Sequence, residues 1–136
     1  MEKLILLLAD YANVDSSGKL NVLGAFGRIY APVFPARHGF MCLVVKLGSE
    51  WGEAGQEKEC KVRFVDEDDK ILASFPPIPF TIPSPNKEAF PEVNFIVQLR
   101  DFVFPRAGAF RFKIFIDDAV EPIGTLPLTV ELRPGQ

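Results

Sequence analysis

The fold class of this chain is decided by residues 104–134, FPRAGAFRFKIFIDDAVEPIGTLPLTVELRP. Each half of this stretch alternates apolar residues with mostly polar ones, the period-2 pattern of a strand with one buried face. The apolar positions are Phe110, Phe112, Ile114 and Ile116 in the first half, and Leu128, Val130 and Leu132 in the second. A lone hairpin is marginal in water, so the rest of the chain must supply a second apolar layer.

Composition limits what the protein can be. A length of 136 residues predicts one domain, residues 1–136, and 48% hydrophobic residues with 13 Phe exclude a mainly disordered chain. The net charge of −3 and the scattered basic residues argue against nucleic-acid and anionic-membrane partners. The apolar run 4–9 is shorter than a signal-peptide core or a transmembrane helix. We therefore expect a cytoplasmic protein.

The remaining segments also favour strands over helices. A short buried helix is the alternative for residues 3–12, but turn residues follow directly and favour a strand. The expected strands are residues 3–12, 18–31, 38–47, 57–65, 71–75 and 93–100, followed by the two halves of 104–134. Residues 3–12 and 18–31 should form one hairpin, and 57–65 with 71–75 another. The nearly continuous apolar run 38–47 predicts a central strand covered on both faces.

Proline dominates residues 76–91, PPIPFTIPSPNKEAFP, and excludes a regular central strand there. Because large apolar residues are interleaved, we expect a stiff crossover between two sheets; a proline-rich ligand for an aromatic groove is the alternative. About eight short strands separated by turns predict an all-β fold, a two-sheet antiparallel β-sandwich. A partly open β-barrel is the alternative.

Groups able to support catalysis are sparse. His38 is the single histidine, and its place after a proline-rich turn predicts a strand-end residue and not a general base. The sequence contains no nucleophile elbow, phosphate-binding loop or metal-spaced Cys/His set. We therefore expect no catalytic residue, no cofactor and no enzyme activity, and keep a carboxylate-based hydrolase as an alternative.

The acidic turn Asp66, Glu67, Asp68 and Asp69 is the best candidate for a cation site, because calcium prefers several carboxylate oxygens on one flexible loop. Asp117 and Asp118 occupy a second turn, which a simple strand count places at the opposite end of the sandwich. A solvated hairpin turn is the competing interpretation of residues 66–69. Asp10 interrupts an apolar strand, and we expect it to accept backbone hydrogen bonds from the turn at residues 13–18.

Two aromatic residues are candidates for a partner surface. Trp51 lies in a polar loop, and Phe115 lies on the otherwise charged face of its strand. Cys42 and Cys60 are expected on neighbouring strands, both facing inward, as two buried free thiols.

Three segments near the start of the chain resemble the opening of a family of small uncharacterised bacterial proteins: ADYAN at 9–13, GKLNVLGAF at 18–26 and FP at 34–35. VDEDDK at 65–70 resembles its acidic hairpin, and AGAFRFKIFIDD at 107–118 its Gly-aromatic strand. The resemblance implies a small β-rich protein and assigns no role to any residue. Together the patterns predict a non-catalytic module for protein-protein interaction or assembly, by self-association or with a protein partner, and a calcium-dependent binder is the alternative.

Overall fold

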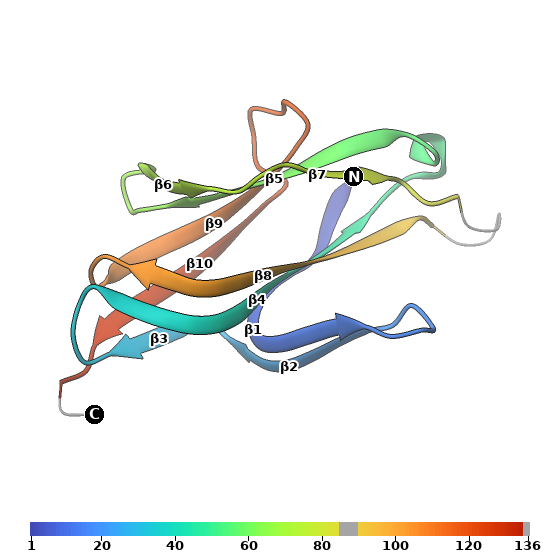
Figure 1. The fold of residues 1–136 in the computed structure, drawn as a ribbon. Helices are drawn as coiled ribbons and strands as arrows, with labels where there is room; N and C mark the ends of the chain where they lie inside the picture. Colours follow the sequence, from blue (N-terminus) through green and yellow to red (C-terminus); the bar gives the residue numbers. More distant parts are fainter. Residues whose placement is uncertain (85–89, 135–136) are drawn as a thin grey trace.

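The computed structural model describes residues 1–84 and 90–134, and these ranges contain ten strands and one short 3-10 helix. The strands are β1 (Glu2–Val14), β2 (Leu20–Phe26), β3 (Arg28–Ala31), β4 (Ala36–Gly48), β5 (Glu57–Val65), β6 (Ile71–Ser74), β7 (Ile78–Thr81), β8 (Glu92–Phe104), β9 (Gly108–Ile116) and β10 (Gly124–Leu132); the helix is η1 (Trp51–Glu53). One sheet has the order β2-β1-β4-β8, and the other has the order β3-β10-β9-β5-β6, with β7 also on β5 (Figure 1). The predicted all-β, two-sheet sandwich is confirmed.

The hairpin predicted from residues 104–134 is present as β9 and β10. The two strands pair antiparallel, with Phe112 opposite Leu126 and Phe110 opposite Leu128. The apolar phase of β9 lies against the other sheet, and Phe110, Phe112 and Ile114 are fully buried. The alternation therefore predicted both strands and most of their buried residues, but Leu132, which was expected on the buried face of β10, is 53% exposed.

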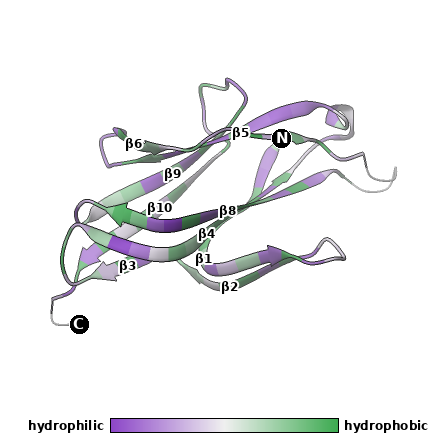
Figure 2. Ribbon diagram, in the orientation of Figure 1, coloured by the Kyte–Doolittle hydropathy of each residue, from purple (hydrophilic) through white to green (hydrophobic). Residues whose placement is uncertain are grey.

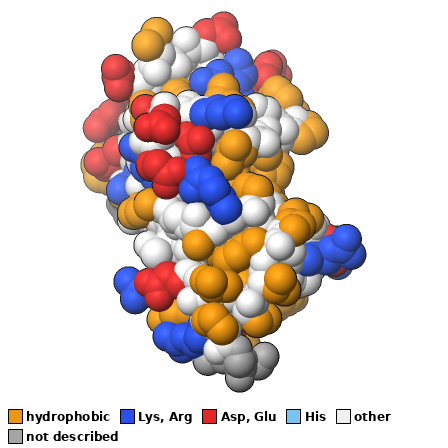
Figure 3. Space-filling model, turned by 90° about the vertical axis from the view of Figure 1, so that its left-hand side faces the viewer, with side chains coloured by type: hydrophobic (Ala, Val, Ile, Leu, Met, Phe, Trp, Pro, Cys, Tyr) orange, Lys and Arg blue, Asp and Glu red, His pale blue; other side chains and the backbone are white. Residues whose placement is uncertain are grey.

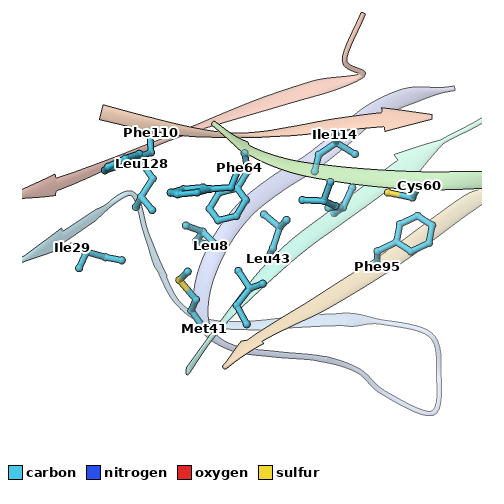
Figure 4. Packing of buried hydrophobic residues seen from close by; sticks show 14 of the residues in the cluster. Leu8, Ile29, Met41, Leu43, Cys60, Phe64, Phe95, Phe110, Ile114 and Leu128 are labelled. Atoms are coloured by element: carbon cyan, nitrogen blue, oxygen red, sulfur yellow. The ribbon is translucent and has the colours of Figure 1, made fainter. Parts of the chain in front are cut away.

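The space between the two sheets holds what we call the main core (Figure 4). Phe64 of β5 lies at its centre, with its ring centroid 5.2 Å from that of Phe110 and 4.9 Å from that of Phe112. Leu8 of β1 and Leu43 of β4 meet these rings from the opposite sheet. Burying one such side chain contributes about 1.5–3 kcal/mol, so this cluster supplies much of the apolar free energy of folding.

Strand β4 lies between β1 and β8 and is buried on both faces, as its apolar run predicted. Leu43 and Val45 face the main core. Cys42 and Val44 are equally buried, but they belong to a separate apolar cluster. The expected position of Cys42 was therefore wrong: it does not face inward with Cys60, and β4 and β5 lie in different sheets because the chain changes sheet between them.

The segment 18–31 was expected to be one strand and is two. β2 pairs antiparallel with β1, but β3 joins the other sheet and pairs parallel with β10. Gly27 separates the two strands, and its carbonyl oxygen accepts a hydrogen bond from the Thr129 amide at 3.1 Å. Among the described strands, β3 and β10 are thus the one parallel pair. The switch between sheets depends on a contact with a distant strand that local sequence does not encode.

The proline-rich segment also gave a strand that was not expected. β6 and β7 pair antiparallel with the two halves of β5, so together they form one interrupted edge strand. The interruption falls at Pro76 and Pro77, which have no backbone N–H to donate. The crossover expected at 76–91 begins only after Thr81, and its residues 85–89 lie outside the described residues. In the described ranges, no helix has the length and apolar character needed to cross a membrane.

Candidate interaction surface

The acidic turn 66–69 is stabilised by hydrogen bonds and by ion pairs with basic side chains. One carboxylate oxygen of Asp66 accepts hydrogen bonds from the backbone amides of Asp68 and Lys70, both at 2.9 Å. Two of the other three carboxylates are ion-paired: Glu67 with Arg106, and Asp69 with Arg111 at 2.9 Å and with Lys113 at 2.8 Å. The sequence placed these carboxylates together correctly, but it did not predict the basic side chains that face them.

These partners change the ionisation of the turn. The hydrogen bond from Arg106 lowers the pKa of Glu67, and the hydrogen bond from Lys113 lowers the pKa of Asp69. A lowered carboxyl pKa means that the interaction stabilises the fold above the ordinary carboxyl pKa and is lost as the pH falls through the lowered value. Within the described ranges, no group of three or more His, Cys, Asp or Glu side chains is arranged to hold a metal ion. The calcium site therefore stays a prediction.

The second acidic turn lies at the other end of the sheet, as the strand count indicated. β5 and β9 pair antiparallel, with Cys60 opposite Ile116 and Val65 opposite Arg111, so residues 66–69 and 117–118 are separated by the length of both strands. Asp117 accepts a hydrogen bond from the Glu59 amide at 2.8 Å, and Asp118 pairs with Lys61 at 3.0 Å.

The end of the sandwich that carries turn 66–69 is shown in Figure 3. Acidic and basic side chains are intermixed over its upper part, and hydrophobic side chains gather below them. Several exposed apolar residues come from strands and loops at this end: Tyr30, Val33, Val103 and Leu132. This end therefore combines a charge-balanced region with a partly apolar one.

The two aromatic candidates have little exposed area. Trp51 is half-buried at the start of η1. Phe115 lies on the charged face, as expected, but it is only 7% exposed because the Arg63 guanidinium lies over its ring, 4.6 Å from the centroid. The expectation that Phe115 is exposed was wrong, and neither residue provides a broad contact for a partner.

Asp10 and His38 lie beside the same hollow of about 500 Å³, which Phe26, Arg28 and Tyr30 also line. His38 is near the start of β4, as expected, with its ring centroid 5.8 Å from that of Phe26. Asp10 was expected to accept backbone hydrogen bonds from the turn at residues 13–18, and this expectation is wrong.

Asp15, inside the turn itself, accepts the backbone hydrogen bonds from Ser17 at 2.9 Å and Lys19 at 3.0 Å. The side-chain hydrogen bond from Ser17 is the main cause that lowers the pKa of Asp15. Asp15, which belongs to the turn, therefore has the role that was expected of Asp10 in the strand.

The β1–β2 hairpin bends near Asp10 and Gly24. Gly24 has a φ of 71°, and a Cβ there would lie 2.4 Å from a carboxylate oxygen of Asp10, so glycine suits the bend for two reasons. Beyond the bend, the hairpin runs along the outer side of the β4–β8 sheet (Figure 1). There its Ala12 packs with Cys42 and Val44 of β4. We call these three residues the hairpin cluster; four partly buried residues pack against it: Leu7, Leu20, Phe40 and Ile96.

The edge strands of the two sheets differ in how well they are protected against pairing with other chains. Natural edges carry charge, proline or a very short strand. β8 carries Arg100 and Asp101 and includes a hydrophilic section (Figure 2), β6–β7 is interrupted by proline, and β3 has four residues. β2 has seven residues, LNVLGAF, without charge or proline, and its one irregularity is the bend at Gly24. Among the described strands, its edge is therefore the least protected.

The side chains of β2 add apolar surface to this edge. Leu23 is 69% exposed, the highest value for a large hydrophobic residue in any described strand. Tyr11 lies directly opposite Leu23 on β1 and is 48% exposed. This surface was not predicted from the sequence, although seven consecutive residues without charge or proline are visible there. Its exposure could not be foreseen, because β2 was expected to continue into residues 28–31.

Comparison with known proteins finds a matching family model and similar solved structures. A family model described as a family of unknown function (DUF6941) matches residues 4–131. No curated protein matches the chain. Among solved structures, the chain is similar to the CARDB domain of the PF1109 protein from Pyrococcus furiosus, crystallised in complex with di-metal ions. The TM-score is 0.45 and the identity 10%, over 98% of each chain.

Proposed function

The chain belongs to DUF6941, a family of unknown function, and we propose that it is a non-catalytic module that binds a protein through the free edge of β2. The observation that carries this proposal is the unprotected edge itself, seven residues without charge or proline. An extended segment of a partner can add a strand to such an edge, where main-chain hydrogen bonds supply affinity and alternate side chains supply specificity.

The exposed face of the hairpin supports a protein partner. Tyr11 and Leu23 form a cross-strand apolar pair beside the edge. Aromatic and aliphatic residues of this kind supply the buried centre of protein interfaces. The carboxylates of Glu67 and Asp69, by contrast, are already engaged by basic side chains, which does not favour the calcium-dependent or hydrolytic alternatives.

The proposal is tested by Leu23→Lys in a tagged protein recovered from cells of the source organism. We expect stoichiometric partners to be lost, because a lysine at this position opposes an apolar contact beside the edge. The matched control is Leu132→Lys, which changes an exposed leucine of β10 in the same way. Both substitutions alter exposed side chains and should change the melting temperature by only about 2 °C. Retention of every partner by Leu23→Lys at the wild-type level would exclude this surface.

A further inference from the structure

The free edge of β3 presents backbone groups that are available for pairing. β3 pairs with β10 on one side, and no described strand pairs with its other side. Two amides of β10 donate to the carbonyl oxygens of Gly27 and Ala31, at 3.1 and 2.8 Å. In a parallel ladder, alternate residues bond to the same neighbour, so Ile29 also bonds to β10. No described residue of β3 has a positive φ, so the N–H and C=O groups of Arg28 and Tyr30 are directed to the free edge.

Two adjoining hollows lie along this edge, where β3 lies next to the start of β4 (Figure 1). The larger one, of about 500 Å³, is lined by Asp10 and by residues 24–26 of the hairpin. The smaller one, of about 220 Å³, is lined by the loop after β3 and by the start of β4. Both include Ile29, Tyr30 and His38 in their walls, so they form one groove, which we call the side groove. Ligand sites usually have volumes of about 300–1,000 Å³, so the side groove is large enough for a short peptide.

The side groove exists because β1 leaves β4. The pairing of these two strands ends at Ala9, opposite Cys42, and the hairpin then bends away. The first residues of β4 therefore have β8 on one side and the side groove on the other. A segment bound in the groove would fill a gap between the two sheets.

The larger part of the side groove contains a carboxylate without a basic partner. Asp10 takes part in none of the ion pairs formed within the described ranges. Its carboxylate lies over Gly24, which has no side chain to cover it. The guanidinium of Arg28, a neighbour in the same wall, pairs with Glu131 at 3.5 Å. This part of the groove therefore favours a cationic group.

The smaller part of the side groove is mainly apolar. Its walls include the buried residues Ile29, Ala31 and Phe104. Pro32 and Val33 of the loop lie at the same hollow, and Val33 is 66% exposed. An aliphatic side chain placed here would remove apolar surface of both molecules from water. This part of the groove therefore favours an aliphatic residue.

From the free edge, the carboxylate and the apolar hollow, we infer that the side groove binds an extended peptide segment of another protein, in which an aliphatic residue and a basic residue are two positions apart. The backbone of the segment bonds to Arg28 and Tyr30. Alternate residues of a strand face the same side, so the aliphatic side chain enters the smaller hollow while the basic one meets Asp10. Main-chain hydrogen bonds supply affinity, and the two side chains supply specificity.

The orientation of the segment follows from the order of the two hollows along β3. The larger hollow lies beside Arg28 and the smaller one beside Ala31. Antiparallel pairing is slightly more stable than parallel pairing, and it places the aliphatic residue before the basic one. The four residues of β3 are too few to pair with a long strand, but they match a short segment. The inference goes beyond the proposed function, because it concerns a different strand.

The first test is fluorescence anisotropy with the full chain and a labelled, end-capped peptide of sequence Ser-Leu-Thr-Lys-Ser. We expect saturable binding with a Kd below about 1 mM. Replacing the peptide lysine by glutamate should weaken binding about fivefold, and replacing its leucine by serine should weaken it at least about tenfold. Asp10→Asn should abolish the preference for lysine over glutamate. The control is Asp118→Asn, an exposed carboxylate at the other end of the β5–β9 pair, which should keep it. No saturable binding, or an unchanged preference in Asp10→Asn, overturns the inference.

The second test is hydrogen exchange measured by NMR, which identifies the backbone groups that bind. At a peptide concentration ten times the Kd, the amides of Arg28 and Tyr30 should exchange about tenfold more slowly. The amide of Ile29 lies between them and already bonds to β10, so its exchange should change much less. Equal changes at all three amides, or no change, overturn the proposed pairing with β3.

The inference and the proposed function fail separately. If the peptide does not bind and Leu23→Lys loses its partners, the side groove is not a peptide site and the β2 edge stands. If the peptide binds as expected and Leu23→Lys retains every partner, the side groove stands and the β2 edge is excluded. Leu23→Lys should leave peptide binding unchanged, because Leu23 does not line the side groove. Loss of peptide binding in this variant overturns the inference.

Discussion

The two apolar clusters of this protein contain one cysteine each, and their surroundings differ. Cys60 belongs to the main core, which two sheets enclose. Cys42 belongs to the hairpin cluster, which is covered on its outer side by the bent end of β1 and β2. Both thiols are buried and free, as predicted. Burial raises the pKa of the Cys60 thiol to about 11.

We expect the two clusters to differ in stability although their residues are equally buried. Opening the main core requires the two sheets to separate, whereas opening the hairpin cluster requires only the far end of one hairpin to lift. Regions with few apolar contacts open locally at a free energy below that of global unfolding. The strand that we propose as a binding edge therefore belongs to the less strongly anchored part of the molecule.

The largest effect is expected from Phe64→Ala, which empties the centre of the main core. Removing a fully buried phenylalanine costs about 3–5 kcal/mol, and Phe64 contacts rings from both sheets. We expect this loss in the free energy of unfolding, measured by urea denaturation. The control is Ile71→Ala on the partner strand β6, half exposed, which should cost much less. Similar losses for the two variants would contradict the central place of Phe64.

A direct comparison of the clusters uses two adjacent valines of β4. Val44 and Val45 are 0% and 1% exposed, and they face the hairpin cluster and the main core respectively. We expect Val45→Ala to cost about 2–3 kcal/mol and Val44→Ala about 1–2 kcal/mol, because the hairpin can collapse onto the space left by Val44. Hydrogen exchange should show faster exchange in β1–β2 for Val44→Ala only. Uniformly faster exchange in both variants would mean that the clusters unfold as one unit.

Labelling of the two native thiols compares how readily the main core and the hairpin cluster open, without any mutation. At pH 8, a thiol with a pKa of about 11 is ionised in about one molecule per thousand, so Cys60 should react only when the sheets separate. We expect a maleimide pulse, analysed by mass spectrometry, to label Cys42 at least about tenfold faster through opening of the hairpin. Val44→Ala should accelerate labelling of Cys42 alone. Faster labelling of Cys60 would contradict our expectation that the hairpin cluster opens more readily than the main core.

The smallest effect is expected from calcium. A site occupied at a hundred times its dissociation constant would stabilise the protein by about 2.7 kcal/mol. Since Glu67 and Asp69 already pair with basic side chains, we expect the melting temperature in millimolar calcium to match that in a chelator. Magnesium at the same concentration controls for ionic strength. A rise of several degrees specific to calcium would restore the acidic turn as a binding site.

Period-2 patterns predicted most of the strands, because each strand carries its own buried face in the sequence. Phe110, Phe112 and Ile114 show this directly, as does the continuous apolar run of β4. The patterns did not predict that Cys42 belongs to a second cluster. That cluster exists only because β1 and β2 bend at Gly24 and cover the outer side of β4, which is a tertiary arrangement.

The candidate surface was less predictable than the fold. Phe115 was recognised as an aromatic residue on a charged face, but the position of Arg63 over its ring depends on pairing between β5 and β9. The edge of β2 depends on the chain leaving the sheet at Gly27. Both features arise from contacts between residues distant in sequence, and local patterns do not report such contacts.

The parallel pairing of β3 with β10 has a consequence for the order of events during protein synthesis. Thr129 pairs with Arg28, roughly 100 residues earlier in the chain, and such distant contacts slow folding. β10 also lies between β3 and β9, so β3 has no strand to join until residues 124–132 have left the ribosome. We therefore expect the nascent chain to expose residues 28–31 for most of its synthesis, which makes this segment a natural target for chaperones.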